Sequence, residues 1–303
     1  MNLNLTTLAS KAMLVKLTTR RANLTKRDMV AEEYLQAELG DTAFIVNKKL
    51  FRDPMNPINQ IMSKAGEVYT YHKQNTLAYI DKGPRLLPNA RYFDYTTEMR
   101  NRISEVDAMM ALHMPNYDKY VQLDVSHRIA QDSGKAKPSR YIAPSADDYP
   151  TAEAFERGMG HDIRFTPLPE AKHFLFDISD DDLKAFEDSM SAVQAQARTE
   201  VIRKMLTPLQ HLVDKLNKPI GTEGAIFRDS AIENVIEGLD MAQKLNIDND
   251  EEVNGIADVL RSAVGVFSNN GDVLRESPIV RENTAKKLDE IAKQMGFLYG
   301  GNQ

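Results

Sequence analysis

The residues of this sequence that could bind a ligand are basic side chains near aromatic ones, most of them in the first third of the chain. The first 27 residues contain six lysines and arginines and no acid. Such cations hold phosphate groups, and neighbouring aromatic rings stack nucleic-acid bases. They can equally pair with acidic residues of another subunit. The candidate phosphate-binding or partner-binding residues are Lys16, Arg20, Arg21, Lys26, Arg27, Lys48, Lys49, Arg52, Arg91 and Tyr92, with a second, smaller cluster of Lys135, Lys137 and Arg140.

The distribution of charge favours a protein partner for these cations over nucleic acid. The chain has a formal net charge of −6. Residues 174–303 carry a balance of −9, which leaves +3 for residues 1–173. Because the net charge opposes binding to DNA, we expect the basic N-terminal end to contact acidic surface on another subunit.

Motifs for catalysis, metals and nucleotides are incomplete in the sequence. It has no cysteine, which excludes disulfides, thiolate nucleophiles and cysteine-rich zinc sites. None of its six histidines has a metal-ligand spacing such as H-E-x-x-H. Ser133-Gly134-Lys135 resembles the end of a phosphate loop, but Ile129 stands where that loop needs a glycine. We therefore predict a protein that is not an enzyme and that uses no cofactor and no metal.

Apolar residues do not cluster into a membrane segment. No apolar run approaches the roughly 18 residues that a membrane-crossing helix needs. Lys11 interrupts the apolar part of the N-terminal end, which therefore lacks the layout of a signal peptide. We expect no membrane partner and no export.

A long amphipathic helix, predicted over residues 177–217, organises the chain that must position the candidate residues. Its apolar side chains recur at steps of three and four, which places them on one stripe of a helix with 3.6 residues per turn. Ser179 is a suitable cap, and Pro208 should bend the last third of the helix. The predicted stripe consists of Leu183, Phe186, Met190, Val193, Ala197, Val201, Met205, Leu209, Leu212 and Leu216.

Shorter elements are predicted on both sides of this helix. Residues 13–19 alternate apolar and polar side chains, which indicates a strand. Helices are expected from a Thr25 cap to about Leu39, from an Asp53 cap to about Ile80, and from Thr97 with a kink at Pro115. We expect the last two to form an antiparallel hairpin. A short helix is expected at residues 151–157, and three more should start near Asp229, Asp250 and Pro278.

These elements predict a mainly α fold, in which long amphipathic helices form a bundle beside a small β element. The β element should combine the strand at 13–19 with residues 86–95 and 163–176. Residues 131–150 are rich in proline and small polar side chains, which indicates a linker or exposed loop. We therefore expect an N-terminal region at 1–130, the linker at 131–150, and a C-terminal helical region at 151–303 built on the long helix.

Several segments together resemble an uncharacterised family of bacteriophage proteins of about this length. They are Asp81–Arg100, Asp147–Glu156, Ile163–Ser179 and a long stretch that starts at IFRDSAIENV (Ile226–Val235) and continues to the last helix. The resemblance brings no activity and no catalytic residue. It implies a phage protein that acts in the cytoplasm of the infected host, among replication or ATPase-linked genes. Members look as though they carry a serine and then a tryptophan in the first strand, where this chain has Thr18-Thr19.

Composition, patterns and resemblance together lead to two hypotheses. The first is a non-enzymatic interaction or scaffold protein, encoded by a phage and oligomeric, whose partners are its own copies and another phage or host protein. The alternative is a single-stranded DNA-binding protein of phage replication or recombination. Salt separates the two, because nucleic-acid binding weakens steeply as salt rises and an apolar interface changes little.

Overall fold

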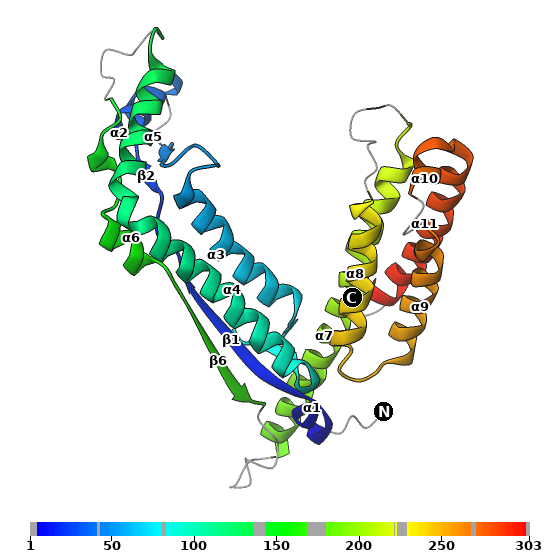
Figure 1. The fold of residues 1–303 in the computed structure, drawn as a ribbon. Helices are drawn as coiled ribbons and strands as arrows, with labels where there is room; N and C mark the ends of the chain where they lie inside the picture. Colours follow the sequence, from blue (N-terminus) through cyan, green and yellow to red (C-terminus); the bar gives the residue numbers. More distant parts are fainter. Residues whose placement is uncertain are drawn as a thin grey trace. The chain divides into compact units, whose positions relative to one another are not determined.

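The computed structural model describes residues 5–40, 43–79, 83–135, 143–168, 180–220, 222, 229–267 and 271–300. The chain forms two compact units, each assembled from separate segments. Unit 1 comprises residues 1–16, 73–95 and 164–303, and unit 2 comprises residues 17–72 and 96–163. Most described residues are helical, and a small sheet is present (Figure 1). The predicted fold class is confirmed.

The small sheet contains the strand that the sequence predicted near its N-terminal end. Strand order is β4-β5-β1-β6, with β1 at Ala12–Arg20, β4 at Leu77–Ala78, β5 at Arg85–Pro88 and β6 at Gly160–Pro167. β1 and β5 are antiparallel, and Leu14 is paired with Leu86. The expected β element is therefore confirmed for residues 86–88 and 163–167, and residues 169–179 lie outside the described part. The rest of the expected segment, from Tyr92, is helical.

Unit 1 is a helical bundle built on the long helix. Its helices are α1 (Leu5–Lys11), α7 (Asp180–Asn217), α8 (Ser230–Leu245), α9 (Glu251–Gly265), α10 (Asp272–Glu276) and α11 (Pro278–Gly300). α7 packs mainly against α8 and α11, and its predicted stripe is buried from Met190 to Leu216. Leu183 is 38% exposed, so the first turn of α7 is not covered, whereas Phe186 is partly buried against the core. Ser179, the expected cap, lies outside the described residues.

Helix α7 continues through Pro208, where the backbone lacks the N–H that would bond to the Lys204 carbonyl. Gly238 of α8 fits against this point. A Cβ on Gly238 would lie 2.9 Å from the Lys204 carbonyl oxygen and 3.0 Å from Pro208 Cγ. The absence of a side chain there is what lets α8 approach α7 so closely.

Unit 2 contains most of two long helices that run antiparallel, as predicted (Figure 1). They are α3 (Pro57–Gln74) and α4 (Tyr92–His113), followed by α5 (Tyr117–Asp132) and α6 (Ala152–Gly158). Lys64 of α3 is 2.9 Å from Glu105 of α4, and the Arg102 guanidinium lies over the Tyr71 ring. The expected kink at Pro115 is a 3₁₀ turn at residues 114–116, which separates α4 from α5.

Two predicted helix starts in unit 2 are wrong. Thr25 begins a short strand, β2 (Thr25–Arg27), which pairs with β3 (Asn47–Lys49). The helix α2 (Met29–Leu39) begins after it, and Asp28 caps it by accepting a hydrogen bond from the Ala31 N–H. α2 ends at Leu39, as predicted, and is followed by Gly40 in a left-handed conformation.

The second wrong start concerns α3. Asp53 and Pro54 form a turn, in which the Asp53 carboxylate accepts from the Met55 N–H. The helix begins at Pro57, so a proline does occupy its first position, but three residues later than predicted. It ends at Gln74 because residues 77 and 78 pair with β5.

The compact units do not follow the expected division at residues 130 and 150. β1, α3 and α4 each pass from one unit into the other, so neither unit is a continuous stretch of sequence. Residues 136–142 of the expected linker lie outside the described part. The end of the linker is well anchored, since Tyr149 is buried and Asp148 binds two lysines.

Candidate functional site

Four of the predicted basic residues are committed to contacts within unit 2. The Arg21 guanidinium donates to the Met62 carbonyl at 3.0 Å. Lys26 and Lys48 bind the two oxygens of the Asp148 carboxylate at 2.9 and 2.7 Å. Burial opposes ionisation of Asp148, but the hydrogen bonds from Lys48 and Lys26 outweigh it and lower the pKa of this carboxyl. Arg27 forms a bidentate ion pair with Glu32, and the hydrogen bonding from Arg27 lowers the pKa of the Glu32 carboxyl.

The aromatic and later basic candidates also have local roles. The Arg91 guanidinium donates to the Asn75 side chain at 2.9 Å. Tyr92 is half-buried, and its ring meets the Phe165 ring edge-on with centroids 5.2 Å apart. Tyr92 therefore takes part in the packing of unit 1. Lys135 lies 3.8 Å from Asp132, while Lys137 and Arg140 lie outside the described residues.

Four candidates remain exposed, with no ion-pair partner in the described part of the chain: Lys16, Arg20, Lys49 and Arg52. They do not form one patch. Lys16 belongs to unit 1 and the other three to unit 2. The Arg20 guanidinium lies against Gly160, where a Cβ would be 2.5 Å from its Nη2 atom. The basic cluster expected from the sequence is therefore divided among several places.

Arg52 lies beside a buried hydrogen-bonded centre around Asp124, a residue that the sequence analysis did not single out. Asp124 of α5 is 5% exposed and accepts from the Phe51 and Arg52 N–H groups, both at 3.1 Å. It also accepts from the Tyr149 hydroxyl, which in turn accepts from Arg128 at 3.2 Å. Burial, followed by the bond to Asp124, raises the pKa of Tyr149 to about 12, so its hydroxyl stays protonated.

A pocket of about 270 Å³ opens next to this centre. Its polar lining includes Arg52, Asp53, Asp124, His127, Arg128 and Gln131. His127 and Arg128 were missed because a lone histidine and arginine on a polar helix give no signal in sequence. Their spacing did contain one clue, since Asp124 and Arg128 lie four residues apart and therefore on the same face of a helix.

A second feature of unit 2 is the segment formed by β2, α2 and β3, here called the arm (residues 25–49). Its two strands pair in antiparallel fashion from Thr25↔Lys49 to Arg27↔Asn47. The Asp28 N–H donates to the Val46 carbonyl at 2.8 Å, and the Gln36 side chain donates to the Phe44 carbonyl at 3.2 Å. The arm is therefore held together by its own hydrogen bonds and is joined to residue 148 by Lys26 and Lys48.

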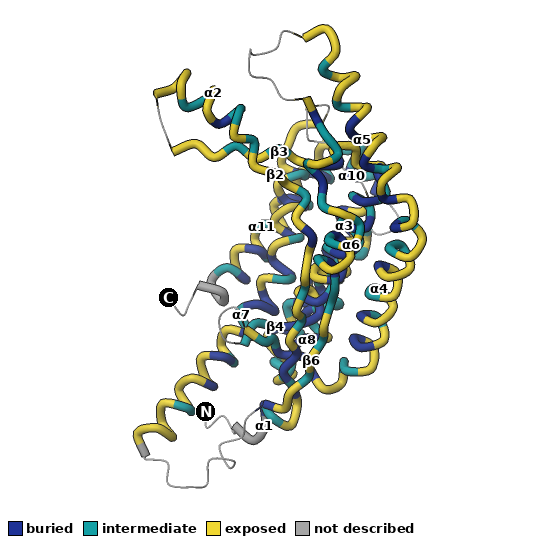
Figure 2. Tube along the Cα trace, turned by 90° about the vertical axis from the view of Figure 1, so that its left-hand side faces the viewer, coloured by how far each residue is buried: buried dark blue, intermediate teal, exposed yellow. Residues whose placement is uncertain are grey.

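Helix α2 of the arm buries one charged side chain and leaves large apolar side chains exposed. Glu32 is 7% exposed, whereas Tyr34 is 55% and Leu39 59% exposed. Figure 2 shows α2 almost entirely in the colours of exposed and intermediate residues. The returning chain adds Phe44 and Ile45 to the exposed apolar surface. An 11-residue helix is marginal alone and gains most of its stability from packing its apolar face, so this surface has the character of an interface.

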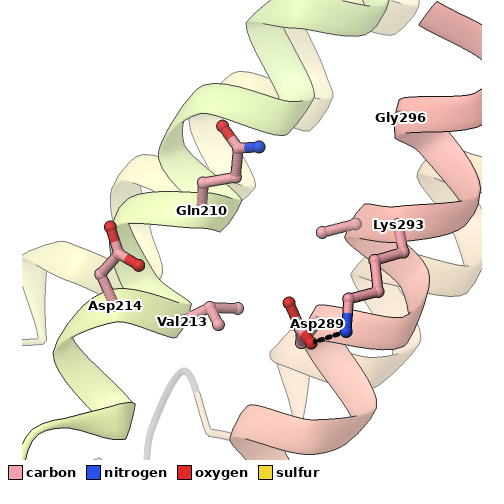
Figure 3. A pocket seen from close by; sticks show the side chains of 7 residues that line it. Gln210, Val213, Asp214, Asp289, Lys293 and Gly296 are labelled. Carbon is pink, nitrogen blue, oxygen red and sulfur yellow. Dashed lines mark ion pairs between the residues drawn. The ribbon is translucent and has the colours of Figure 1, made fainter. Parts of the chain in front are cut away.

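Unit 1 contains a larger groove between α7 and α11, of about 630 Å³ (Figure 3). Gln210 and Asp214 line it from α7, and Asp289 and Lys293 from α11. Lys293 binds Asp289 at 2.7 Å, and their hydrogen bond raises the pKa of Lys293. One of the two acids is therefore already paired with the lysine, and the described residues of the lining include no histidine and no hydroxyl side chain.

A buried charge cluster joins α7 to the strands of unit 1. Glu200 of α7 accepts from Arg85 at 2.6 Å and from the Ala78 N–H. Lys204, one turn later, donates to the Lys73 and Gln74 carbonyls, both at 3.0 Å, at the end of α3. Burial lowers the pKa of Lys204 to about 8, although Glu200 acts in the opposite direction.

Because of Lys204, the stability of unit 1 should rise with pH in the alkaline range. Because its pKa falls from 10.5 to about 8 on folding, the unfolded chain holds more protons between these values, and stability rises with pH in that window. The neutral amine still has two N–H groups for the two carbonyls. We expect wild type to gain about 2 kcal/mol relative to Lys204→Met between pH 7.5 and pH 9.5, in urea unfolding followed by circular dichroism. Parallel pH profiles for the two proteins would contradict this assignment.

Among the described residues, no three histidine or acidic side chains are placed to hold a metal ion. None of the described helices has the length and apolarity to span a membrane. Comparison with protein-family models, with curated proteins and with solved structures finds no match for this chain.

Proposed function

We propose that this chain is a non-enzymatic interaction protein that self-associates through its arm. The observation that carries the proposal is the exposed apolar surface of α2, where Tyr34 is 55% and Leu39 59% exposed. Covering an apolar side chain contributes about 25 cal/mol per Å². A partner surface on this side of α2 would stabilise both the helix and the complex. Arg21, Lys26 and Arg27 already bind groups within unit 2. They are therefore less available for the phosphates of a nucleic acid, which favours a protein partner.

The partner that fits the arm best is a second copy of the same arm. α2 begins beside the strand pair and ends at Gly40, so Glu38 lies near the tip and Lys49 at the base. Both side chains are exposed, and neither has an ion-pair partner in the described part of the chain. A twofold antiparallel pairing of two arms places the tip of each beside the base of the other. Each Glu38 then meets the opposite charge of the other copy's Lys49 around a shared apolar centre.

The test is the mass of the protein in solution. We expect wild type to give about twice the monomer mass of 34.2 kDa by light scattering, and Tyr34→Glu to weaken the dimer at least tenfold, because a carboxylate would lose its hydration in the apolar centre. Val266→Asp is the matched control, since Val266 is 70% exposed and lies in unit 1. Wild type that remains a monomer at tens of micromolar would overturn the proposal.

A charge exchange tests the antiparallel arrangement separately. Glu38→Lys and Lys49→Glu should each weaken the dimer a few-fold by placing like charges together, and the double variant should recover it. Additive losses in the double variant would exclude this pairing even if the arm forms the interface.

The biological setting that we propose is the cytoplasm of a phage-infected host, with another phage or host protein as a further partner. This part rests on the resemblance of the sequence segments alone. To test the setting and self-association together, two differently tagged copies of the gene are expressed during infection. Recovery of one tagged copy together with the other from the soluble fraction is the expected result.

A further inference from the structure

The pocket beside Asp124 is a candidate for binding a small anion, because its acids already accept hydrogen bonds and its two arginines have N–H groups to spare. The Asp124 carboxylate already accepts from two backbone N–H groups and one hydroxyl. Asp53 accepts from the Met55 N–H at 2.9 Å. Both carboxylates therefore have hydrogen-bond donors of their own, and neither is ion-paired with an arginine of the pocket in the described part of the chain.

The remaining donors in the lining come from Arg52, His127 and Arg128. Arg52 and His127 are exposed, and neither side chain has a hydrogen-bond or ion-pair partner in the part that the structure describes. Arg128 uses one N–H for the Tyr149 hydroxyl and has others to offer. The position of Arg52 is fixed at its backbone, since its own N–H is bound to Asp124.

We infer that this pocket binds a phosphoryl group. Arginine presents a planar fork of donors that matches phosphate oxygens, and two arginines with a histidine supply several donors beyond the one that Arg128 gives to Tyr149. A phosphoryl group carries three acceptor oxygens and about −1.5 to −2 charge. The volume of about 270 Å³ is below the range of pockets that enclose drug-sized ligands. The phosphoryl group therefore enters while the rest of its carrier stays outside.

A phosphoryl group with this geometry can belong to a small phosphate compound or to the backbone of single-stranded nucleic acid. The site is independent of the arm interface, because none of its donors lies within residues 25–49. Failure of phosphate binding would therefore not contradict the proposed arm dimer, and failure of the dimer would not contradict phosphate binding.

The experiment titrates wild type with inorganic phosphate by calorimetry and with a fluorescent oligothymidylate by anisotropy, at low salt. We expect millimolar binding of phosphate and at least a tenfold loss in Arg52→Gln, whose exposed side chain can change without unfolding the protein. Arg100→Gln is the matched control, an exposed arginine on α4 of the same unit. Arg128→Gln gives a second variant, and its circular dichroism is compared because it also loses the Tyr149 bond.

The two ligands distinguish a small phosphate compound from the nucleic-acid backbone as the source of the phosphoryl group. Binding of phosphate alone, sensitive to Arg52, assigns a small phosphate compound, and oligonucleotide binding with the same sensitivity assigns the nucleic-acid backbone. No binding of either ligand, or equal loss in Arg52→Gln and Arg100→Gln, would overturn the inference.

Discussion

Val201→Asp should strongly destabilise unit 1. Val201 is 2% exposed in the middle of α7, among the apolar side chains that α7, α8 and α11 bury together. An aspartate there has no cationic partner in the apolar stripe, so its charge is buried unpaired or its carboxyl must take up a proton. The cost is about 3–5 kcal/mol, a large share of the 5–15 kcal/mol that typically stabilises a folded domain.

The measurement is urea unfolding followed by circular dichroism at 222 nm, since α7 alone contributes 38 helical residues. Val259→Asp is the matched control, because Val259 is also in a helix of unit 1 but is 55% exposed. The control should change stability by less than about 0.5 kcal/mol. Similar unfolding curves for the two variants would mean that the centre of the α7 stripe is not covered.

The helical bundle of unit 1 could be predicted because its pattern is local and repeated. The stripe of α7 recurs from Leu183 to Leu216, and α8, α9 and α11 begin at or within a residue of the expected starts. α10 was missed because a five-residue helix offers too few positions for a period to show.

The arm could not be predicted, because pairing between distant residues overrides the local signal. Thr25 followed by Asp28 reads as a helix start, yet Thr25 pairs with Lys49, and the cap is Asp28 itself. The same limit applies to the candidate site. Sequence predicted which side chains are basic, but it could not show that Asp148 brings Lys26 and Lys48 together or that Arg52 lies beside Arg128.

Asp124→Ala should destabilise unit 2 nearly as strongly as Val201→Asp destabilises unit 1. The alanine would leave the Phe51 and Arg52 N–H groups and the Tyr149 hydroxyl without their acceptor. Each unsatisfied buried donor costs about 1–3 kcal/mol. Phe51 adds to this cost, since its φ of 50° is in the left-handed region and the bond to Asp124 helps to hold it there.

A graded series separates the lost hydrogen bonds from general damage to α5. We expect a loss of about 3–5 kcal/mol for Asp124→Ala, a smaller loss for Asp124→Asn, which keeps one acceptor oxygen, and about 1 kcal/mol for Tyr149→Phe, which removes a single donor. Gln122→Ala is the control on the exposed side of the same helix and should stay within about 0.5 kcal/mol of wild type. If Tyr149→Phe cost as much as Asp124→Ala, the hydroxyl bond would dominate and the two backbone donors would contribute little. If Asp124→Ala matched Gln122→Ala, water would replace the carboxylate without loss, and Asp124 would not be what fixes the turn that carries Arg52 into the pocket.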